Sequence, residues 1–193
     1  MNILVGYNGF VGSNILRQMN FDYLYNSKNI NDAFNTKPDL CIYAGVKSMK
    51  FYANKNPIED YNHILETIEN IKKINPKRLI LISTIDVFDI LEKVDEKHQI
   101  KDENLQPYGK NRRILEKWVE ENIESYNIVR LPALYGNGLK KNFLFDLMNP
   151  IPNTLSKKSF EKLSEKNDLI DIIEFYKGLG DIIEPKKNEF MVV

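Results

Sequence analysis

Residues 2–13 read NILVGYNGFVGS, and this stretch decides how the rest of the chain is interpreted. It starts with an apolar strand-like run and ends with a helix-like run, and Gly6, Gly9 and Gly12 are spaced three apart between them. In such a turn the first glycine permits a tight bend, the second lets the backbone approach a pyrophosphate, and the third allows close packing of the helix. The N–H groups at the helix start face the anion. The stretch therefore predicts a dinucleotide site, against the alternative of a tight strand-to-helix turn that binds no ligand.

Short apolar runs alternate with longer segments of helical periodicity along the chain. The expected strands are residues 2–5, 23–26, 40–44, 78–83 and 126–131. Two long helices are expected over 56–74 and 108–122. The first of them starts with Pro57, and Glu59 and Asp60 complement the helix dipole. This order is typical of βαβ units around a parallel sheet.

The pattern predicts an α/β fold with a Rossmann-type, doubly wound parallel sheet. We expect one domain over residues 1–193, with a dinucleotide-binding core in 1–135. A reduced C-terminal substrate lobe is expected over 136–193. Within that lobe Lys140, Lys141 and Asn142 are suited to the phosphates of a ligand, unless the lysines are solvated.

Composition argues against several classes of protein. Lys and Arg number 27 and Asp and Glu also 27, so no global field favours nucleic acid. The single cysteine, Cys41, rules out a disulfide framework or a thiolate metal cluster and fits the reducing cytoplasm. His63 and His98 lack ligand-spaced partners, and the sequence shows no charged leader or bilayer-spanning apolar run. We therefore expect a cytoplasmic protein with no metal, nucleic acid or membrane partner.

The end of the second expected strand bears on the choice of cofactor. A carboxylate there would accept hydrogen bonds from the ribose diol of NAD. Residues 23–29 read YLYNSKN and offer Asn26, Ser27 and Lys28 but no acid. Lys28 is suited to a 2′-phosphate, unless it is a solvated surface lysine. We expect NADP to be preferred, with NAD possible.

Three further motifs carry a resemblance to a known family. Residues 81–88 read LISTIDVF at a strand end, and residues 107–118 read PYGKNRRILEKW at a helix start. With the glycine triplet, they resemble the extended short-chain dehydrogenases/reductases. The NAD(P)-dependent sugar-nucleotide epimerases, dehydratases and reductases of that family carry a Ser-Thr-x-x-Val-Tyr/Phe strand end and a Tyr-x-x-x-Lys helix. Residues 130–138, RLPALYGNG, resemble the family's segment that lines the nicotinamide and substrate pocket.

The resemblance implies three catalytic residues, and Asp86 is a fourth candidate because it is a carboxylate beside the expected carbonyl site. Tyr108 would give a proton to a carbonyl that accepts hydride, and Thr84 would help to polarise that carbonyl. Arg112 stands where the family has lysine, and it would lower the pKa of the phenol or hold the cofactor ribose. Its planar fork is not interchangeable with an ammonium, so this departure puts activity in question. Asp86 would either move a proton or hold a turn.

The resemblance also implies the residues that bind the cofactor. They are Gly6, Gly9, Phe10, Val11, Gly12, Ser27, Lys28, Ala44, Gly45, Tyr108 and Arg112.

Three functions are open at this point. The first is an NAD(P)-dependent enzyme acting on a nucleotide-activated sugar, most simply a keto-sugar reductase. The second is a sugar-nucleotide epimerase or dehydratase, which would need Asp86 or another acid in the pocket. The third is a non-catalytic NADP-binding sensor or partner-binding protein that kept the glycine turn and lost the lysine. The family also implies a homodimer, paired through helices 56–74 and 108–122.

Overall fold

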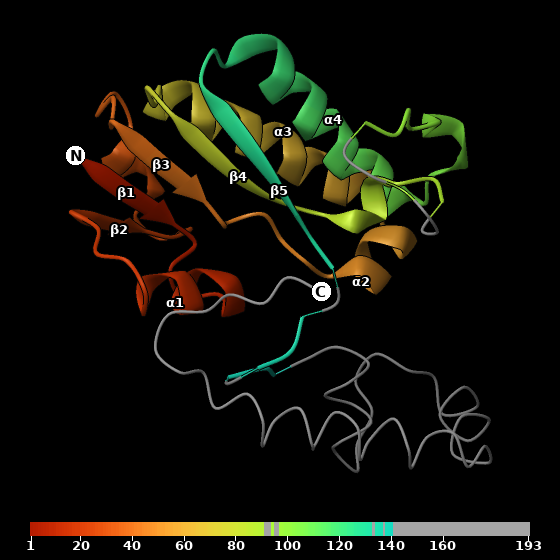
Figure 1. Cartoon of the computed structure of the whole chain (residues 1–193), viewed down its shortest axis with the longest axis horizontal. Helices are drawn as coiled ribbons and strands as arrows, with labels where there is room; N and C mark the ends of the chain where they lie inside the picture. Colours follow the sequence, from red (N-terminus) through yellow and green to blue (C-terminus); the bar gives the residue numbers. More distant parts are fainter. Residues whose placement is uncertain (91–93, 95–96, 133, 137, 141–193) are drawn as a thin grey trace. The chain divides into compact units, whose positions relative to one another are not determined.

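The expected strands lie together in one parallel sheet. The computed structural model describes residues 1–90, 94, 97–132, 134–136 and 138–140. Its strands are β1 (Asn2–Val5), β2 (Tyr23–Tyr25), β3 (Leu40–Tyr43), β4 (Leu79–Thr84) and β5 (Tyr126–Leu131). They pair in the order β2-β1-β3-β4-β5, and each pairing is parallel (Figure 1). All carboxyl ends therefore meet at one edge, where α/β proteins bind ligands.

Helices connect these strands. They are α1 (Phe10–Leu16), α2 (Lys50–Lys55), α3 (Pro57–Ile74) and α4 (Pro107–Asn122), with short 3₁₀ turns η1 (Ile30–Ala33), η2 (Ile85–Val87) and η3 (Asp102–Asn104). The expected strands and the two long helices are found with ends that differ by at most one residue. The sequence pattern did not predict α2, whose six residues are too few for a periodic apolar stripe.

Helices cover the sheet on both faces. Successive side chains of a strand point to opposite faces, so each strand supplies apolar residues to both layers. Ile3 and Val5 of β1 belong to the core under α3 and α4, where Ile64 and Leu115 are buried. Leu4, between them, packs on the opposite face with residues of α1 and β3. Figure 1 shows α1 on one side of the sheet and α3 with α4 on the other. The predicted doubly wound arrangement is confirmed.

The described residues belong almost entirely to the first of two units, which divide after Pro132. The predicted single domain stays a prediction, because the expected lobe at 136–193, with Lys141 and Asn142, falls mostly outside the described residues. No helix in the described part of the chain combines the length and apolar character needed to cross a membrane. A cytoplasmic location likewise stays a prediction.

Candidate active site

The glycine turn joins β1 to α1, and packing within the protein explains two of its three glycines. Gly6 has a φ of +87°, and a Cβ there would lie 2.5 Å from the carbonyl oxygen of Ala44. A Cβ on Gly12 would lie 2.1 Å from the carbonyl oxygen of Gly6. Both distances are far below van der Waals contact, so no side chain fits at either position. These glycines hold the turn against the neighbouring backbone.

Gly9 differs from the other two glycines because the described fold does not require it. Its backbone is extended, with φ −77° and ψ 168°, a conformation that any residue adopts. A Cβ there would meet only the carbonyl oxygen of Gly6, at an ordinary 3.4 Å. Gly9 precedes α1 without a side-chain cap, and the first N–H groups of a helix have no partner inside it. Gly9 therefore leaves a bare backbone surface beside the N–H groups of Phe10 and Val11.

The ends of β2 and β3 adjoin this turn. The N–H of Gly6 donates to the carbonyl of Tyr25 at 2.7 Å, and the N–H of Ala44 donates to Val5 at 2.8 Å. After β2, the N–H of Lys28 donates to the side chain of Asn26 at 2.8 Å.

The predicted cofactor residues Ser27, Lys28, Ala44 and Gly45 therefore follow strands paired directly with β1. Gly45 packs close as well, since a Cβ there would lie 3.2 Å from Val5 Cγ1. The arrangement fits a dinucleotide whose pyrophosphate lies over the glycine turn.

The second part of the site is the first turn of α4. Tyr108 is buried, with 7% of its surface exposed, and its N–H donates to Asn54 Oδ1 at 2.9 Å. A Cβ on Gly109 would lie 1.9 Å from the carbonyl oxygen of Asp86, so a glycine is needed where α4 meets η2. This close backbone contact brings Tyr108 to the carboxyl end of β4.

Arg112 lies one turn after Tyr108 and is almost fully buried, with 3% exposed. Its guanidinium donates to Asp60 of α3 and to the carbonyl of Lys47. The guanidinium carbon lies 3.9 Å from the centroid of the Tyr108 ring. Asn111 also donates to Asp60, at 2.8 Å. Arg112 thus contacts the face of the Tyr108 ring, while its nitrogens donate hydrogen bonds to α3 and to the loop after β3.

Thr84 and Asp86 form a tight turn at the end of β4. Thr84 Oγ1 donates to Asp86 Oδ2 at 3.2 Å and accepts the N–H of Asp86 at 3.2 Å. Lys50 of α2 donates to the other carboxylate oxygen, Oδ1, at 2.5 Å. Asp86 therefore holds the turn in this structure, one of the two roles expected for it.

The pKa of the Tyr108 hydroxyl is raised from its ordinary value of 10.0. Burial is the main cause, because it disfavours the charged phenolate. The charge of Arg112 opposes the rise, whereas the carboxylates of Asp86 and Asp60 add to it. The hydroxyl therefore stays protonated at neutral pH.

Glu116 lies one turn after Arg112 on the same face of α4, and it is fully buried. Ser83 Oγ donates to it at 2.6 Å, Arg130 Nη2 at 2.8 Å and Arg113 Nη1 at 3.0 Å. Ser83 and Arg130 are register partners on β4 and β5, so one carboxylate joins α4 to both strands beside Thr84.

Several residues of this region were not expected in the site, among them Lys50, Asn54, Asp60 and Glu116. Asp60 was expected only to complement a helix dipole. Glu116 was detectable in part, because residues 108, 112 and 116 recur every four positions on one helix face. The sequence holds no signal that pairs Asp60 with Arg112.

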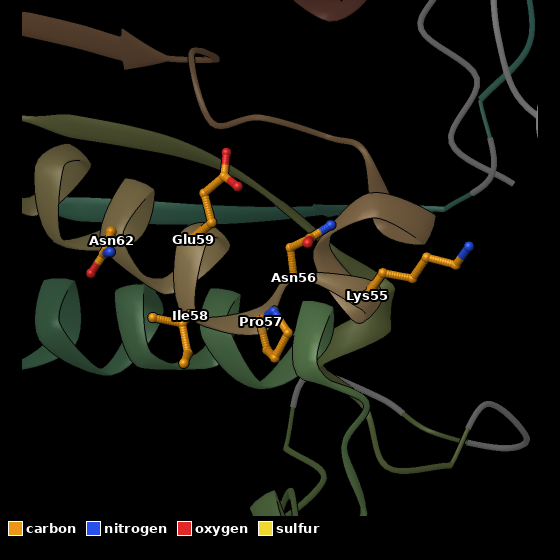
Figure 2. A pocket seen from close by; sticks show the side chains of 6 residues that line it. All are labelled: Lys55, Asn56, Pro57, Ile58, Glu59 and Asn62. Carbon is orange, nitrogen blue, oxygen red and sulfur yellow. The ribbon is translucent and has the colours of Figure 1, made fainter.

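Figure 2 shows an open pocket at the start of α3, lined by Lys55, Asn56, Pro57, Ile58, Glu59 and Asn62. None of the expected site residues lines it. Over the residues that the structure describes, no cluster of three His, Cys, Asp or Glu could hold a metal.

Comparison with known proteins agrees with the fold. The family model described as "RmlD substrate binding domain" matches residues 1–156. A dTDP-4-dehydrorhamnose reductase from Clostridium acetobutylicum ATCC 824 superposes with a TM-score of 0.62 at 23% identity, over 77% of this chain and 58% of that one. The dTDP-4-dehydrorhamnose reductase from Bacillus anthracis str. Ames in complex with NADP gives 0.62 at 24% identity, over 76% and 58%.

A third structure, RMD from Pseudomonas aeruginosa complexed with NADPH, gives a TM-score of 0.56 at 16% identity, over 75% of this chain and 58% of that one. This chain thus covers less than two thirds of these three proteins. Curated proteins gave no match. The likenesses confirm the predicted Rossmann-type fold, and the family model confirms the predicted resemblance.

Proposed function

Since the chain belongs to the RmlD substrate binding domain family, we propose that it is an NADP-dependent reductase of a keto group on a nucleotide-activated sugar. NAD is the alternative cofactor. The relatives solved with NADP and NADPH support this choice, as does Lys28 after β2, where no acid is present. A 2′-phosphate needs a cation there, whereas a free ribose diol favours a carboxylate.

The observation that carries the proposal is the contrast among the three glycines. Packing demands Gly6 and Gly12, whereas a Cβ added at Gly9 would lie 3.4 Å from the carbonyl oxygen of Gly6, an ordinary contact. A glycine that the fold does not need is explained by a ligand that approaches the backbone there. A pyrophosphate is such a ligand, because it takes N–H groups at a helix start.

The chemistry at the other end of the site follows from the state of Tyr108. A bound NADPH would supply hydride to the carbonyl carbon of the substrate. The Tyr108 hydroxyl, kept protonated by its raised pKa, would donate its proton to the carbonyl oxygen. Thr84 would help to polarise the carbonyl once its proton turns from Asp86 toward the substrate. Arg112 would hold the ring of Tyr108 in place.

The same observations rank the alternatives. An epimerase or dehydratase needs a base to remove a proton from the sugar. Tyr108 is protonated at neutral pH because its pKa is raised, so little phenolate is present to act as that base, and Asp86 is bonded to Lys50 and Thr84. Besides the hydride that NADPH would supply, reduction needs a proton donor at the carbonyl oxygen, and the buried, protonated Tyr108 would fill that role. A non-catalytic NADP-binding protein remains the alternative from a different class.

The test is a reductase assay with purified protein, NADPH and a 4-keto-sugar nucleotide, followed by the loss of NADPH absorbance. The expected result is turnover that depends on Tyr108. NADP binding without turnover on any keto-sugar nucleotide would favour the non-catalytic alternative. Absence of both binding and turnover would overturn the proposal.

We further propose that the protein is a homodimer paired through α3 and α4. Support comes from Ile58, Tyr61 and Leu65, which are 76%, 38% and 41% exposed and recur on one stripe of α3. Sedimentation at tens of micromolar protein should give a dimer, and Leu65→Glu should give a monomer. Met19→Glu, a matched change of an exposed apolar residue outside these helices, should stay dimeric. A monomeric wild type would contradict the proposal.

A further inference from the structure

A buried ion pair lies directly beside the proposed proton donor. Arg112 and Asp60 expose 3% and 5% of their surfaces, and the guanidinium contacts the ring face of Tyr108. We infer that Asp60 is a positioning residue for Tyr108: it holds the Arg112 guanidinium against the ring and balances its charge, so that the hydroxyl remains a proton donor. This inference rests on the proposed function, in which Tyr108 gives the proton.

The geometry explains why an arginine stands at this position. Its nitrogens donate to the carboxylate of Asp60 on α3 and to the carbonyl of Lys47 after β3, while its central carbon lies over Tyr108. A planar guanidinium can donate hydrogen bonds to partners in different directions and stack on an aromatic ring at the same time. A lysine ammonium is a single point charge and has no plane to stack. Arg112, which replaces the lysine of the family, is therefore accompanied by Asp60, which binds the guanidinium and fixes its orientation.

The charges around Tyr108 come from four elements. Arg112 lies on α4, Asp60 on α3 and Asp86 on η2, and Lys50 of α2 is bonded to Asp86. The two cations are each paired with a carboxylate, so the charges balance around the phenol. Loss of the Asp60 carboxylate alone would leave Arg112 as an unbalanced cation under the ring. A nearby unbalanced cation favours phenolate over phenol.

The consequence concerns the direction of proton transfer. With Asp60 charged, Tyr108 is a neutral acid suited to protonating an alkoxide that forms during reduction. Without that carboxylate, phenolate forms at lower pH, so less of the neutral Tyr108 hydroxyl is present to donate a proton. Asp60 thus sets the protonation state of a residue that it does not itself bond.

The test follows Tyr108 directly by NMR of protein labelled with carbon-13 at the tyrosine Cζ, whose shift reports ionisation. Tyr108→Phe identifies the signal. Asp60→Asn keeps the shape of the side chain and removes its charge, and it should lower the pKa of Tyr108 by about one unit or more. An unchanged or higher pKa in Asp60→Asn would overturn the inference. The measurement needs no substrate, so it succeeds or fails independently of the reductase assay.

A second variant covers the case in which a lone buried Arg112 prevents folding of Asp60→Asn. The double variant Asp60→Asn, Arg112→Met removes both charges, so neither partner stays buried alone. If Asp60 balances Arg112, the two losses offset each other and Tyr108 should titrate within about half a unit of wild type. A pKa raised by about one unit or more, as expected for loss of an unbalanced cation, would contradict the inference.

The matched control is Asp39→Asn. Asp39 precedes β3 at the opposite edge of the sheet, where it pairs with Lys77 and the N-terminal amine. Its loss removes a paired carboxylate far from the site and should leave the titration of Tyr108 unchanged. A shift equal to that of Asp60→Asn would show a global effect of charge and overturn the positioning role.

Discussion

The glycine turn and the first turns of α4 lie at the same edge of the sheet, but they are built in opposite ways. The glycine turn works through missing side chains, and its parts lie within a few residues of one another. The α4 region works through buried side chains from several elements, and the Arg112–Asp60 contact joins residues 52 positions apart. The first offers bare backbone to an anion, and the second holds one hydroxyl in a fixed place and charge state.

This difference predicts different responses to mutation. In the glycine turn, a mutation adds atoms and acts through steric overlap. At Gly6 and Gly12 the added atoms collide with the protein backbone and destabilise the fold, whereas at Gly9 they would obstruct the ligand. In the α4 region, removed atoms act through unpaired buried charge. The predictions below begin with the changes expected to have the largest effect.

Gly12→Val should have the largest effect on stability. The Cβ of the new residue would overlap the carbonyl oxygen of Gly6, which belongs to the backbone and cannot move aside. Destabilisation by more than about 3 kcal/mol is expected, measured by urea unfolding. Gly9→Ala is the matched control and should cost no more than about 1 kcal/mol, the loss expected because alanine is less favourable than glycine at the N-cap of α1. If both variants had equal stability, the distinction between the glycines would be lost.

Glu116→Gln should be the next largest change in stability. It removes the charge of a fully buried carboxylate that pairs with Arg130 and Arg113, whose side chains are only 17% and 16% exposed, and breaking such a largely buried ion pair costs about 3 kcal/mol in other proteins. Glu120→Gln, one turn further along α4, removes a partly exposed partner of Arg113 and should cost less than about 1 kcal/mol. Urea unfolding of the two variants measures the difference. If the two variants lost similar amounts of unfolding free energy, the buried ion pairs of Glu116 would contribute no more to stability than the partly exposed pair of Glu120.

Tyr108→Phe should lower turnover about a hundredfold, the usual scale for a positioned acid, with little effect on cofactor affinity. The wild-type pH profile gives a second readout. Because the pKa of Tyr108 is raised, the alkaline loss of turnover should lie above pH 10.0, the ordinary value for tyrosine. Full activity in Tyr108→Phe, or a loss of turnover well below pH 10.0 that Tyr108→Phe abolishes, would contradict the proposed role.

Ser27→Asp should produce the smallest effect, a change in cofactor preference. A carboxylate after β2 accepts from a ribose diol and repels a 2′-phosphate, so NAD should bind better than NADP in the variant. Calorimetry with both cofactors measures the ratio of affinities. An unchanged ratio would show that the ribose lies elsewhere.

The two regions also differ in how far the sequence predicts them. The strands, the long helices and the glycine turn follow from local patterns, since periodicity and glycine spacing act over a few residues. Tyr108, Thr84 and Arg112 came from motifs, and the structure places Arg112 against the Tyr108 ring. The Asp60 contact could not be foreseen, because the packing of α3 on α4 decides which distant carboxylate meets a buried arginine. The short helix α2, which supplies Lys50, was missed for lack of a repeating pattern.

The most direct test of the central claim is a calorimetric titration of NADP into the wild-type protein and into Gly9→Val. Valine readily adopts the extended backbone found at Gly9, so the variant should fold like wild type in a melting control. The account predicts that wild type binds NADP and that Gly9→Val binds it at least about tenfold more weakly, a loss of about 1.4 kcal/mol. No binding by wild type at millimolar NADP, or equal binding by the two proteins, would contradict it.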